Sequence, residues 1–481
     1  MLLALPAQLG CHCANPACDS GLVSREVCCR TGYELARVPP CQEHLSSTVN
    51  LHDGVTEAEA VETALSNNSA FQATLAQLGM ACGDSIQASL IANPQLLVYF
   101  PTSIKEGQYT LYAPIESYFL RPARVKAANR EYRRVGEQLV QNGLDVARDA
   151  RLAYIDLALA DEQARLAQEA IDIRNQVVQL TNQRLNEGDI SQLESITSRV
   201  DQLNAQAAHG VRQQDISIAE ARLALLMGLP FQDEPLRATE LPRPEFGEFD
   251  ESALVSQALA CRPDYHAARW AVAAASQRSD LSRWTFLRLD GMLDVRSNSG
   301  SSKTGGGLRI DLPVFNRNQG GIVRADWELN AAMHSRDAIR DQIVQDVRTA
   351  ARQYIQARDN LVLLEQQVAP TIDEALSIAK KGYEDGGTDY LLVLQTASQY
   401  LDVRSRMLDQ RAAMARAAAE LERSVGCRLD GEPMDLVRLL EETSPPEELE
   451  LPLSSPTAAE PSEMESGDLS PPATSFATLL D

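Results

Sequence analysis

The 481-residue sequence is poor in aromatic residues and has no long hydrophobic run. Phe, Trp and Tyr make up 5% of the chain, although 44% of its residues are hydrophobic. No run of 18 apolar residues occurs, which argues against a transmembrane helix. Alanine, leucine, glutamine, arginine and glutamate fill the middle of the chain instead, a composition typical of long helices. We therefore expect a mainly helical fold.

The sequence also lacks the residue patterns of common catalytic and nucleotide-binding sites. The glycine run at 305–307 has no following lysine and no strand-to-helix context, so it does not match a phosphate loop. Residues 303–307 are expected to form a surface loop. No Ser/His/Asp or Cys/His grouping supports nucleophilic catalysis. The formal net charge of -23 argues against nucleic acid as a partner, because phosphate binding needs a basic surface.

The two ends of the chain differ from the middle. Residues 1–50 contain six of the nine cysteines, without the paired C-x-x-C spacing of zinc sites. No metal site is assigned, and a metal, disulfides or an unstructured leader remain alternatives. The apolar run before Cys11 resembles the end of an export signal with a lipid-accepting cysteine, although no basic residue precedes it. Residues 443–481 hold eight acids, seven prolines and no Lys or Arg, so 431–481 is expected to be a disordered acidic tail.

The middle of the chain contains the same pattern twice. Gly188 in RLNEGDISQLE and Gly386 in GYEDGGTDYLL lie 198 residues apart, and the same shift aligns Gly228 with Gly426. Such a unit is longer than the repeats of solenoid proteins. We therefore expect a tandem duplication. The expected repeats are residues 51–242 and 243–430.

Each repeat contains one very long helical pattern. Between 152 and 180, apolar residues recur at steps of three and four, which places them on one seam of a helix. Pro122 is the only proline between 119 and 185, and it stands near the start, where proline is tolerated. A helix over this span would be a rod of about 100 Å. The pattern returns over 321–382, where Pro370 predicts a kink.

A polar glycine turn follows each long helix. A glycine at the end of a helix favours positive φ, and the next helix then begins with a capping residue. In the first turn, Ser191 and Glu194 match an S-x-x-E capping box. In the second turn, Asp389 is the expected cap. The glycines that end the two helices are Gly188, and Gly386 or Gly387.

Each repeat also contains two strand patterns. Residues 286–296 place Leu and Val on one face and Asp and Arg on the other, and a polar loop leads to a second strand at 308–312. The first repeat offers shorter strands at 95–101 and 108–115. Such hairpins suit either a soluble sheet or a closed membrane barrel with a wet lumen. Four strands cannot close a barrel without exposed edges, so a membrane barrel would need several chains.

The order of these segments resembles the TolC-type outer-membrane efflux proteins. The resemblance covers about residues 50–428 and includes EAEAVETALSNN, IANPQLL, LRIDLPVFNRNQG, GLP and GYEDGGTDYLLVLQTASQY. It implies a mainly α chain of long antiparallel helical hairpins with four β-strands. Three such chains would form an α-barrel continued by a twelve-stranded β-barrel. It also implies an outer-membrane location with a long periplasmic extension, and neither catalysis nor a cofactor.

The resemblance further implies that the two turns gate the periplasmic tip. Family members often carry acidic residues just past the turn, where this chain has Leu392 and Gln395, so that acidic pair is absent. Glu194 takes the equivalent place in the first copy, and a ring of three carboxylates would favour cations. Asp189 and Asp389 are alternatives. A purely capping role is the competing interpretation for each of these acids.

We therefore expect a channel subunit that passively exports small molecules, metal ions or polypeptides. Its partners would be two further copies of itself, a periplasmic adaptor protein, an inner-membrane pump and outer-membrane lipid. The alternative is a soluble or peripheral coiled-coil scaffold or adaptor with its hairpins in a soluble sheet. The doubled hairpin-and-rod unit favours the channel, since an adaptor normally needs one helical hairpin.

Overall fold

Helices dominate this computed structural model, which describes residues 21–33, 35, 54–100, 107–231, 235–247, 249–298 and 301–429. Cys11 and the acidic tail lie outside these residues. The elements are α1 (Gly21–Thr31), α2 (Glu57–Asn67), α3 (Ser69–Ser89), β1 (Gln95–Tyr99), β2 (Gly107–Pro114), α4 (Glu116–Glu187), α5 (Gln192–Leu226), α6 (Glu251–Cys261), α7 (Pro263–Ser282), β3 (Leu289–Asn298), β4 (Ser301–Ile310), α8 (Gln319–Leu363), the π-helix η1 (Leu364–Val368), α9 (Ala369–Glu384) and α10 (Tyr390–Val425). We call α2 to α5 the first half and α6 to α10 the second half.

The long helix predicted in the first half is confirmed. Helix α4 has 72 residues and contains Pro122 in its second turn, and at about 1.5 Å per residue it is about 108 Å long. In the second half the equivalent rod is divided by the π-helix η1, which ends just before Pro370. Proline cannot donate to the carbonyl of Gln366 and its ring would collide with that group, so the wider π turn accommodates it.

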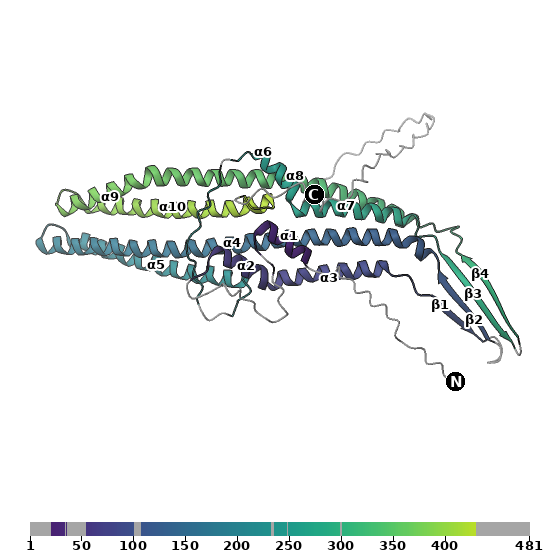
Figure 1. Cartoon of the computed structure of the whole chain (residues 1–481). Helices are drawn as coiled ribbons and strands as arrows, with labels where there is room; N and C mark the ends of the chain where they lie inside the picture. The colour runs from purple at the N-terminus through teal and green to yellow at the C-terminus, as the bar shows by residue number, and fades with distance from the viewer. Residues whose placement is uncertain are drawn as a thin grey trace, which may run out of the picture. The chain divides into compact units, whose positions relative to one another are not determined.

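The long helices pack as antiparallel pairs. Figure 1 shows α4 beside α5 and α9 beside α10, with the two turns at the same end of the helices and the strands at the other end. Small apolar residues dominate where α4 meets α10, including Ala158, Ala412 and Ala415. Small side chains let the helix axes approach closely, which suits a wall of side-by-side helices.

Two tyrosines at corresponding positions of the two halves hydrogen-bond to the segment between α5 and α6, which joins the halves. Tyr154 and Tyr354 are each 1% exposed. The Tyr154 hydroxyl donates to the Glu240 carbonyl at 2.9 Å, and the Tyr354 hydroxyl donates to the Pro244 carbonyl at 3.2 Å. The connecting segment therefore follows the helices closely, because its own backbone groups are satisfied by them.

The four strands form one antiparallel sheet in the order β1-β2-β3-β4 (Figure 1). The expectation of a surface loop at 303–307 is wrong, because these residues lie inside β4 and Gly305 pairs with Asp294. Glycine has a low preference for strands, but the exposed edge of β3 supplies hydrogen-bond partners along the whole segment. Tertiary pairing therefore outweighs local propensity here.

Candidate functional site: the membrane-facing sheet and the helical tip

The sheet presents one apolar and one polar face. Opposite residues in an antiparallel pair share a face, and the register places Leu111 opposite Leu293. Leu96, Leu308 and Ile310 are 62%, 65% and 54% exposed, so the apolar face is open in the single chain. The residues of the apolar face are Leu96, Val98, Tyr109, Leu111, Ala113, Leu289, Leu293, Val295, Leu308 and Ile310.

The polar face is organised around Asp294. Its carboxylate accepts hydrogen bonds from Thr110 Oγ1 at 3.0 Å, Gln108 Nε2 at 3.1 Å and Arg296 Nε at 2.9 Å. Three donors satisfy this carboxylate on the sheet surface, and two of them, Thr110 and Gln108, join β2 to β3. A face of this kind suits contact with water, whereas the opposite face suits contact with lipid.

Strand length agrees with this division of the sheet. Strands β3 and β4 have ten residues each, which extend about 34 Å and cover about 24 Å when tilted by 45°. That height matches the apolar band of an outer-membrane barrel, about 25 Å. Strand β1 has five residues and β2 has eight, so within the described residues the first hairpin is the shorter one.

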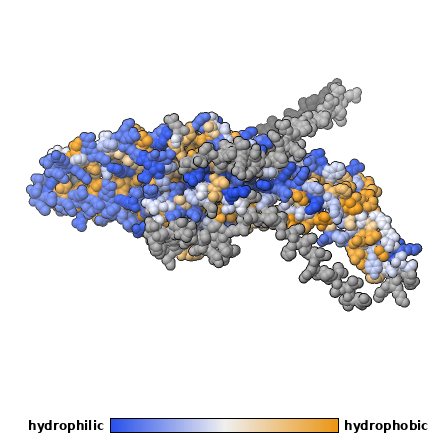
Figure 2. Space-filling view, in the orientation of Figure 1, coloured by the Kyte–Doolittle hydropathy of each residue, from blue (hydrophilic) through white to orange (hydrophobic). Residues whose placement is uncertain are grey.

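Exposed aromatic residues flank the strand ends. Tyr118, Phe119, Trp284 and Phe315 are 57%, 72%, 59% and 94% exposed, just outside β2, β3 and β4. Figure 2 shows hydrophobic residues gathered over the strands and the adjoining helix ends, whereas the opposite helical end is mainly hydrophilic. Aromatic rings in this position are typical of the membrane–water boundary. The sequence analysis did not single them out; their signal is an aromatic residue four or five positions from the end of β2, β3 or β4.

In the first tip turn, the glycine that ends α4 has the positive φ that the sequence predicts. Gly188 has φ +83°, and its N–H and that of Asp189 donate to the carbonyls of Leu185 and Arg184. The Ser191 hydroxyl accepts from the Glu194 N–H at 3.3 Å and caps α5. The Glu194 carboxylate instead accepts from the Ser191 hydroxyl at 3.4 Å. The bond that would complete the expected capping box, from the Ser191 N–H, is not formed.

The second tip turn differs in its cap. Gly386 has φ +76°, and it is the glycine of the pair that takes the left-handed conformation; Gly387 does not. Asp389 stands at the N-cap position of α10, but its side chain makes no capping hydrogen bond. The expected side-chain cap is therefore wrong, and only the Asp389 carbonyl joins the helix, accepting from the Leu392 N–H at 3.2 Å.

A cluster that the sequence analysis missed joins the two hairpins at the tip. Tyr383 is 1% exposed and lies under the Arg184 guanidinium, which is 4.7 Å from the ring centroid. Tyr390 donates a hydrogen bond from its hydroxyl to Asp201 at 2.9 Å. Burial raises the pKa of the Tyr383 hydroxyl; Arg184 lowers this pKa in part, and the charge of nearby Glu194 adds to the rise. These contacts pack the second half's tip against the first.

The three candidate constriction residues occupy two helices. Glu194 is half-buried in the first turn of α5, and Leu392 and Gln395 are exposed and three residues apart on α10. A spacing of three puts Leu392 and Gln395 on one helix face. Within the single chain, the structure therefore shows an acidic residue on one hairpin and an uncharged pair on the other.

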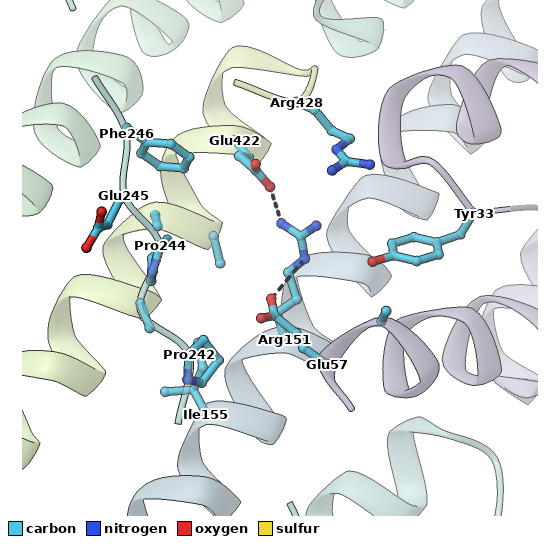
Figure 3. Close-up of a pocket in the computed structure, with 14 residues that line it drawn as sticks. Tyr33, Glu57, Arg151, Ile155, Pro242, Pro244, Glu245, Phe246, Glu422 and Arg428 are labelled. Carbon is cyan, nitrogen blue, oxygen red and sulfur yellow. Dashed lines mark hydrogen bonds and ion pairs between the residues drawn. The ribbon is translucent and has the colours of Figure 1, made fainter. Parts of the chain in front are cut away.

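A cavity of about 290 Å³, lined by both charged and apolar side chains, lies beside the middle of α4, and Figure 3 shows its lining. Arg151 of α4 reaches into it and forms ion pairs with Glu57 of α2, at 3.4 Å, and with Glu422 of α10. Burial alone would lower the pKa of the Arg151 guanidinium, but the two carboxylates raise it above its ordinary value. Arg151 therefore stays charged and ties the first half to the end of the second.

The described part of the chain contains neither a metal-binding group of side chains nor a membrane-spanning helix. No group of three or more His, Cys, Asp or Glu side chains there is placed to hold a metal ion. Among the same residues, no helix combines the length and the hydrophobicity that crossing a bilayer requires.

Long helical hairpins that carry a two-faced sheet with an aromatic border define the class of outer-membrane channel-forming proteins. The sequence model of the outer membrane efflux proteins matches residues 60–229 and again 254–427. The chain belongs to the outer membrane efflux protein family. It is an outer-membrane efflux channel subunit with a periplasmic helical extension, and the alternative of a soluble scaffold or adaptor is wrong.

The chain is similar in sequence to metal-resistance proteins and similar in structure to solved channel proteins. The chain is 26% identical over 383 residues to the cobalt-zinc-cadmium resistance protein CzcC of Cupriavidus metallidurans, covering 77% of this chain and 90% of CzcC. It is 25% identical over 245 residues to the nickel-cobalt-cadmium resistance protein NccC of Alcaligenes xylosoxydans xylosoxydans, covering 50% of this chain and 54% of NccC. The solved structure of CusC has the same fold, with a TM-score of 0.68, 18% identity and coverage of 82% of this chain and 99% of CusC.

Proposed function

We propose that three copies of this chain form one channel that exports divalent metal cations. The observation that carries the trimer is the open sheet: among the described residues, β1 and β4 each have one unpaired edge, and the apolar face is uncovered. Unpaired strand edges are not tolerated in lipid. Three sheets joined edge to edge give a closed barrel of twelve strands, with polar faces toward the lumen.

An apolar stripe on α5 supports the same assembly in the helical part. Leu193, Ile196, Val200 and Leu203 are 73%, 53%, 49% and 54% exposed. They recur at steps of three and four, the spacing of a coiled-coil seam that needs a partner helix. In the trimer this seam packs against the neighbouring subunit, so that the helices of three chains enclose a periplasmic tunnel.

The two halves are two copies of one unit, residues 51–242 and 243–430. Positive φ at equivalent glycines supports this duplication: Gly228 has φ +70° and Gly426 has φ +80°. The two separate matches to the family support it as well. Duplication makes six helical hairpins in a trimer, enough to surround a central pore.

The turns at the ends of these hairpins form the periplasmic gate. Gly188 and Asp189 belong to one turn, and Gly386, Gly387 and Asp389 to the other. A ring of three Glu194 carboxylates narrows the pore and favours cations. Leu392 and Gln395 line the pore on the second hairpin. A periplasmic adaptor and an inner-membrane pump deliver the cargo to this end.

Metal cations are the proposed cargo because CzcC and NccC are named for resistance to cobalt, zinc, cadmium and nickel. The subunit has no reaction of its own in this scheme. It provides a path whose acidic entrance concentrates cations. Lipid attachment at Cys11 stays a prediction.

Two measurements test the proposal. Protein extracted from outer membranes with detergent should have the mass of three chains by native mass spectrometry; a water-soluble single chain would refute the assembly. Deleting the gene in its host should lower tolerance of Co²⁺, Zn²⁺ and Cd²⁺ several-fold, and the plasmid-borne gene should restore it. Unchanged metal tolerance with an intact trimer would refute the proposal that metal cations are the cargo, and would leave the trimer standing.

A further inference from the structure

Two buried cysteines meet where the second half begins and ends. Cys261 is the last residue of α6, and Cys427 follows Gly426, the C-cap of α10. Their side chains are 0% and 4% exposed and belong to one hydrophobic cluster. The two thiols interact with each other, and Gln257 Nε2 donates to Cys427 Sγ at 3.1 Å.

The backbone around the two cysteines is held in close contact. A Cβ built on Gly426 would lie 3.2 Å from the Arg262 Cα. Arg30 of α1 adds a second link, because its Nη1 donates to the carbonyl of Cys261 and to that of Gly426, the latter at 3.4 Å. A disulfide needs Cα atoms about 4.4 to 6.8 Å apart, and the close approach of Arg262 and Gly426, the residues next to the two cysteines, is compatible with such a distance.

We propose that Cys261 and Cys427 are oxidised to a disulfide when the chain folds in the periplasm. Both are free thiols in the structure, and the periplasm is an oxidising compartment.

The oxidant is a protein or small-molecule disulfide, and the exchange is balanced. One of the two cysteines loses its proton and, as the thiolate, attacks one sulfur of that disulfide and releases the other as a thiolate, which takes up a proton. The second cysteine thiol then loses its proton and attacks the sulfur of the first, so the S–S bond forms and the second oxidant thiolate leaves. Two protons and two electrons pass from the cysteines to the oxidant. Since both thiols are buried after folding, the reaction precedes final packing.

The disulfide would join the two ends of the second half covalently. The cysteines are 166 residues apart in sequence, and closing a long loop restricts the unfolded chain strongly. The disulfide holds the end of α6 against the end of α10, near the middle of the long helical hairpins. Movement of the tip, at the far end of α9 and α10, is left unrestricted.

Peptide mapping of the full-length chain tests the proposal. The protein is exported in a Gram-negative host, thiols are blocked with N-ethylmaleimide at lysis, and the trimer is purified from the outer membrane without reductant. After denaturation and digestion, mass spectrometry should find the Cys261 and Cys427 peptides linked. Both peptides carrying N-ethylmaleimide, or either one linked to another cysteine, would overturn the proposal.

Variants provide an independent readout. Cys261→Ser, Cys427→Ser and the double variant should lower the thermal midpoint equally, by at least about 3 °C, and reductant should lower the midpoint of the parent by more than that of the double variant. Cys29→Ser, which alters an exposed thiol of α1, is the matched control and should leave the midpoint unchanged. Additive effects of the two single changes, with reductant acting equally on the parent and the double variant, would show that the thiols act only by packing.

Discussion

The Tyr390 hydroxyl donates a hydrogen bond to the Asp201 carboxylate at 2.9 Å and so joins α10 to α5 at the tip. Tyr390 is 6% exposed, so the bond is shielded from water on the tyrosine side. Burial and the Asp201 charge together raise the pKa of the Tyr390 hydroxyl, which therefore remains a donor at neutral pH. This contact is a specific link between the hairpins of the two halves.

Tyr390→Phe should loosen the tip while preserving the ring. Loss of a hydrogen bond to a charged group costs about 1.5 to 3 kcal/mol, so hydrogen exchange should speed up in peptides around 195–205 and 385–396. The control is Tyr400→Phe, which removes a 2.7 Å bond to the exposed Glu169 farther along α10. Equal exchange in the two variants would contradict a specific role for Tyr390.

Gly386→Ala should destabilise the second tip turn by about 1 to 2 kcal/mol, because a side chain is strained at φ +76°. A Cβ at Gly386 meets no atom within 4 Å, so the cost is conformational rather than steric. The neighbouring Gly387→Ala is the control, since its backbone is outside the positive-φ region. Thermal unfolding and metal export measure the effect. Comparable losses in both variants would disprove a requirement for positive φ.

Valine at both Gly188 and Gly386 should impair export more than either single change. A β-branched side chain is least compatible with left-handed backbone, and the two turns lie at the same end of the helices (Figure 1). Metal tolerance of cells that carry the double variant measures the outcome. Normal metal tolerance, with normal amounts of trimer in the outer membrane, would show that these turns do not form the gate.

Glu137 should make stability depend on pH near neutrality. Burial raises the pKa of its carboxyl from 4.5 to about 7; Arg30 and Arg133 lower it in part, and Glu26 adds to the rise. The folded chain holds this proton more tightly than the unfolded chain, so stability falls as pH rises from about 4.5 to 7. The penalty is complete above the folded pKa and reaches at most about 3 kcal/mol.

Glu137→Gln removes that penalty. The variant should be more stable than the parent at pH 8, and the difference should vanish at pH 4. The exposed Glu374→Gln is the control and should match the parent at both pH values. Thermal midpoints measured across this range provide the check. A parent and variant with parallel pH profiles would show that Glu137 is not protonated in the fold.

Glu194→Gln should weaken cation selectivity without damaging the turn. The Ser191 hydroxyl still accepts from the backbone N–H of residue 194, so α5 keeps its cap. In planar bilayers the cation-to-anion permeability ratio should fall at least about twofold. Glu187→Gln, on the other side of the same turn, should change it less. An unaltered ratio would leave the Glu194 carboxylate with its contact to the Ser191 hydroxyl only.

The sequence by itself determined the features that depend on neighbouring residues in the chain. A span with few helix breakers and a three-and-four apolar spacing produced α4 as one helix, and glycine at a helix end produced positive φ at Gly188 and Gly386. Local rules succeed in these cases because a backbone conformation is chosen by contacts within a few residues. Even so, they failed for the Asp389 side chain, which makes no cap.

Tertiary structure alone decided the pairs that lie far apart in sequence. Tyr390 and Asp201 meet, as do Arg151 and Glu422, only because antiparallel packing sets which turns of two long helices face each other. That register follows from the fit of many side chains together and has no signature in either segment alone. Gly305 shows the same effect in the sheet: it is in a strand because β3 offers it hydrogen-bonding partners.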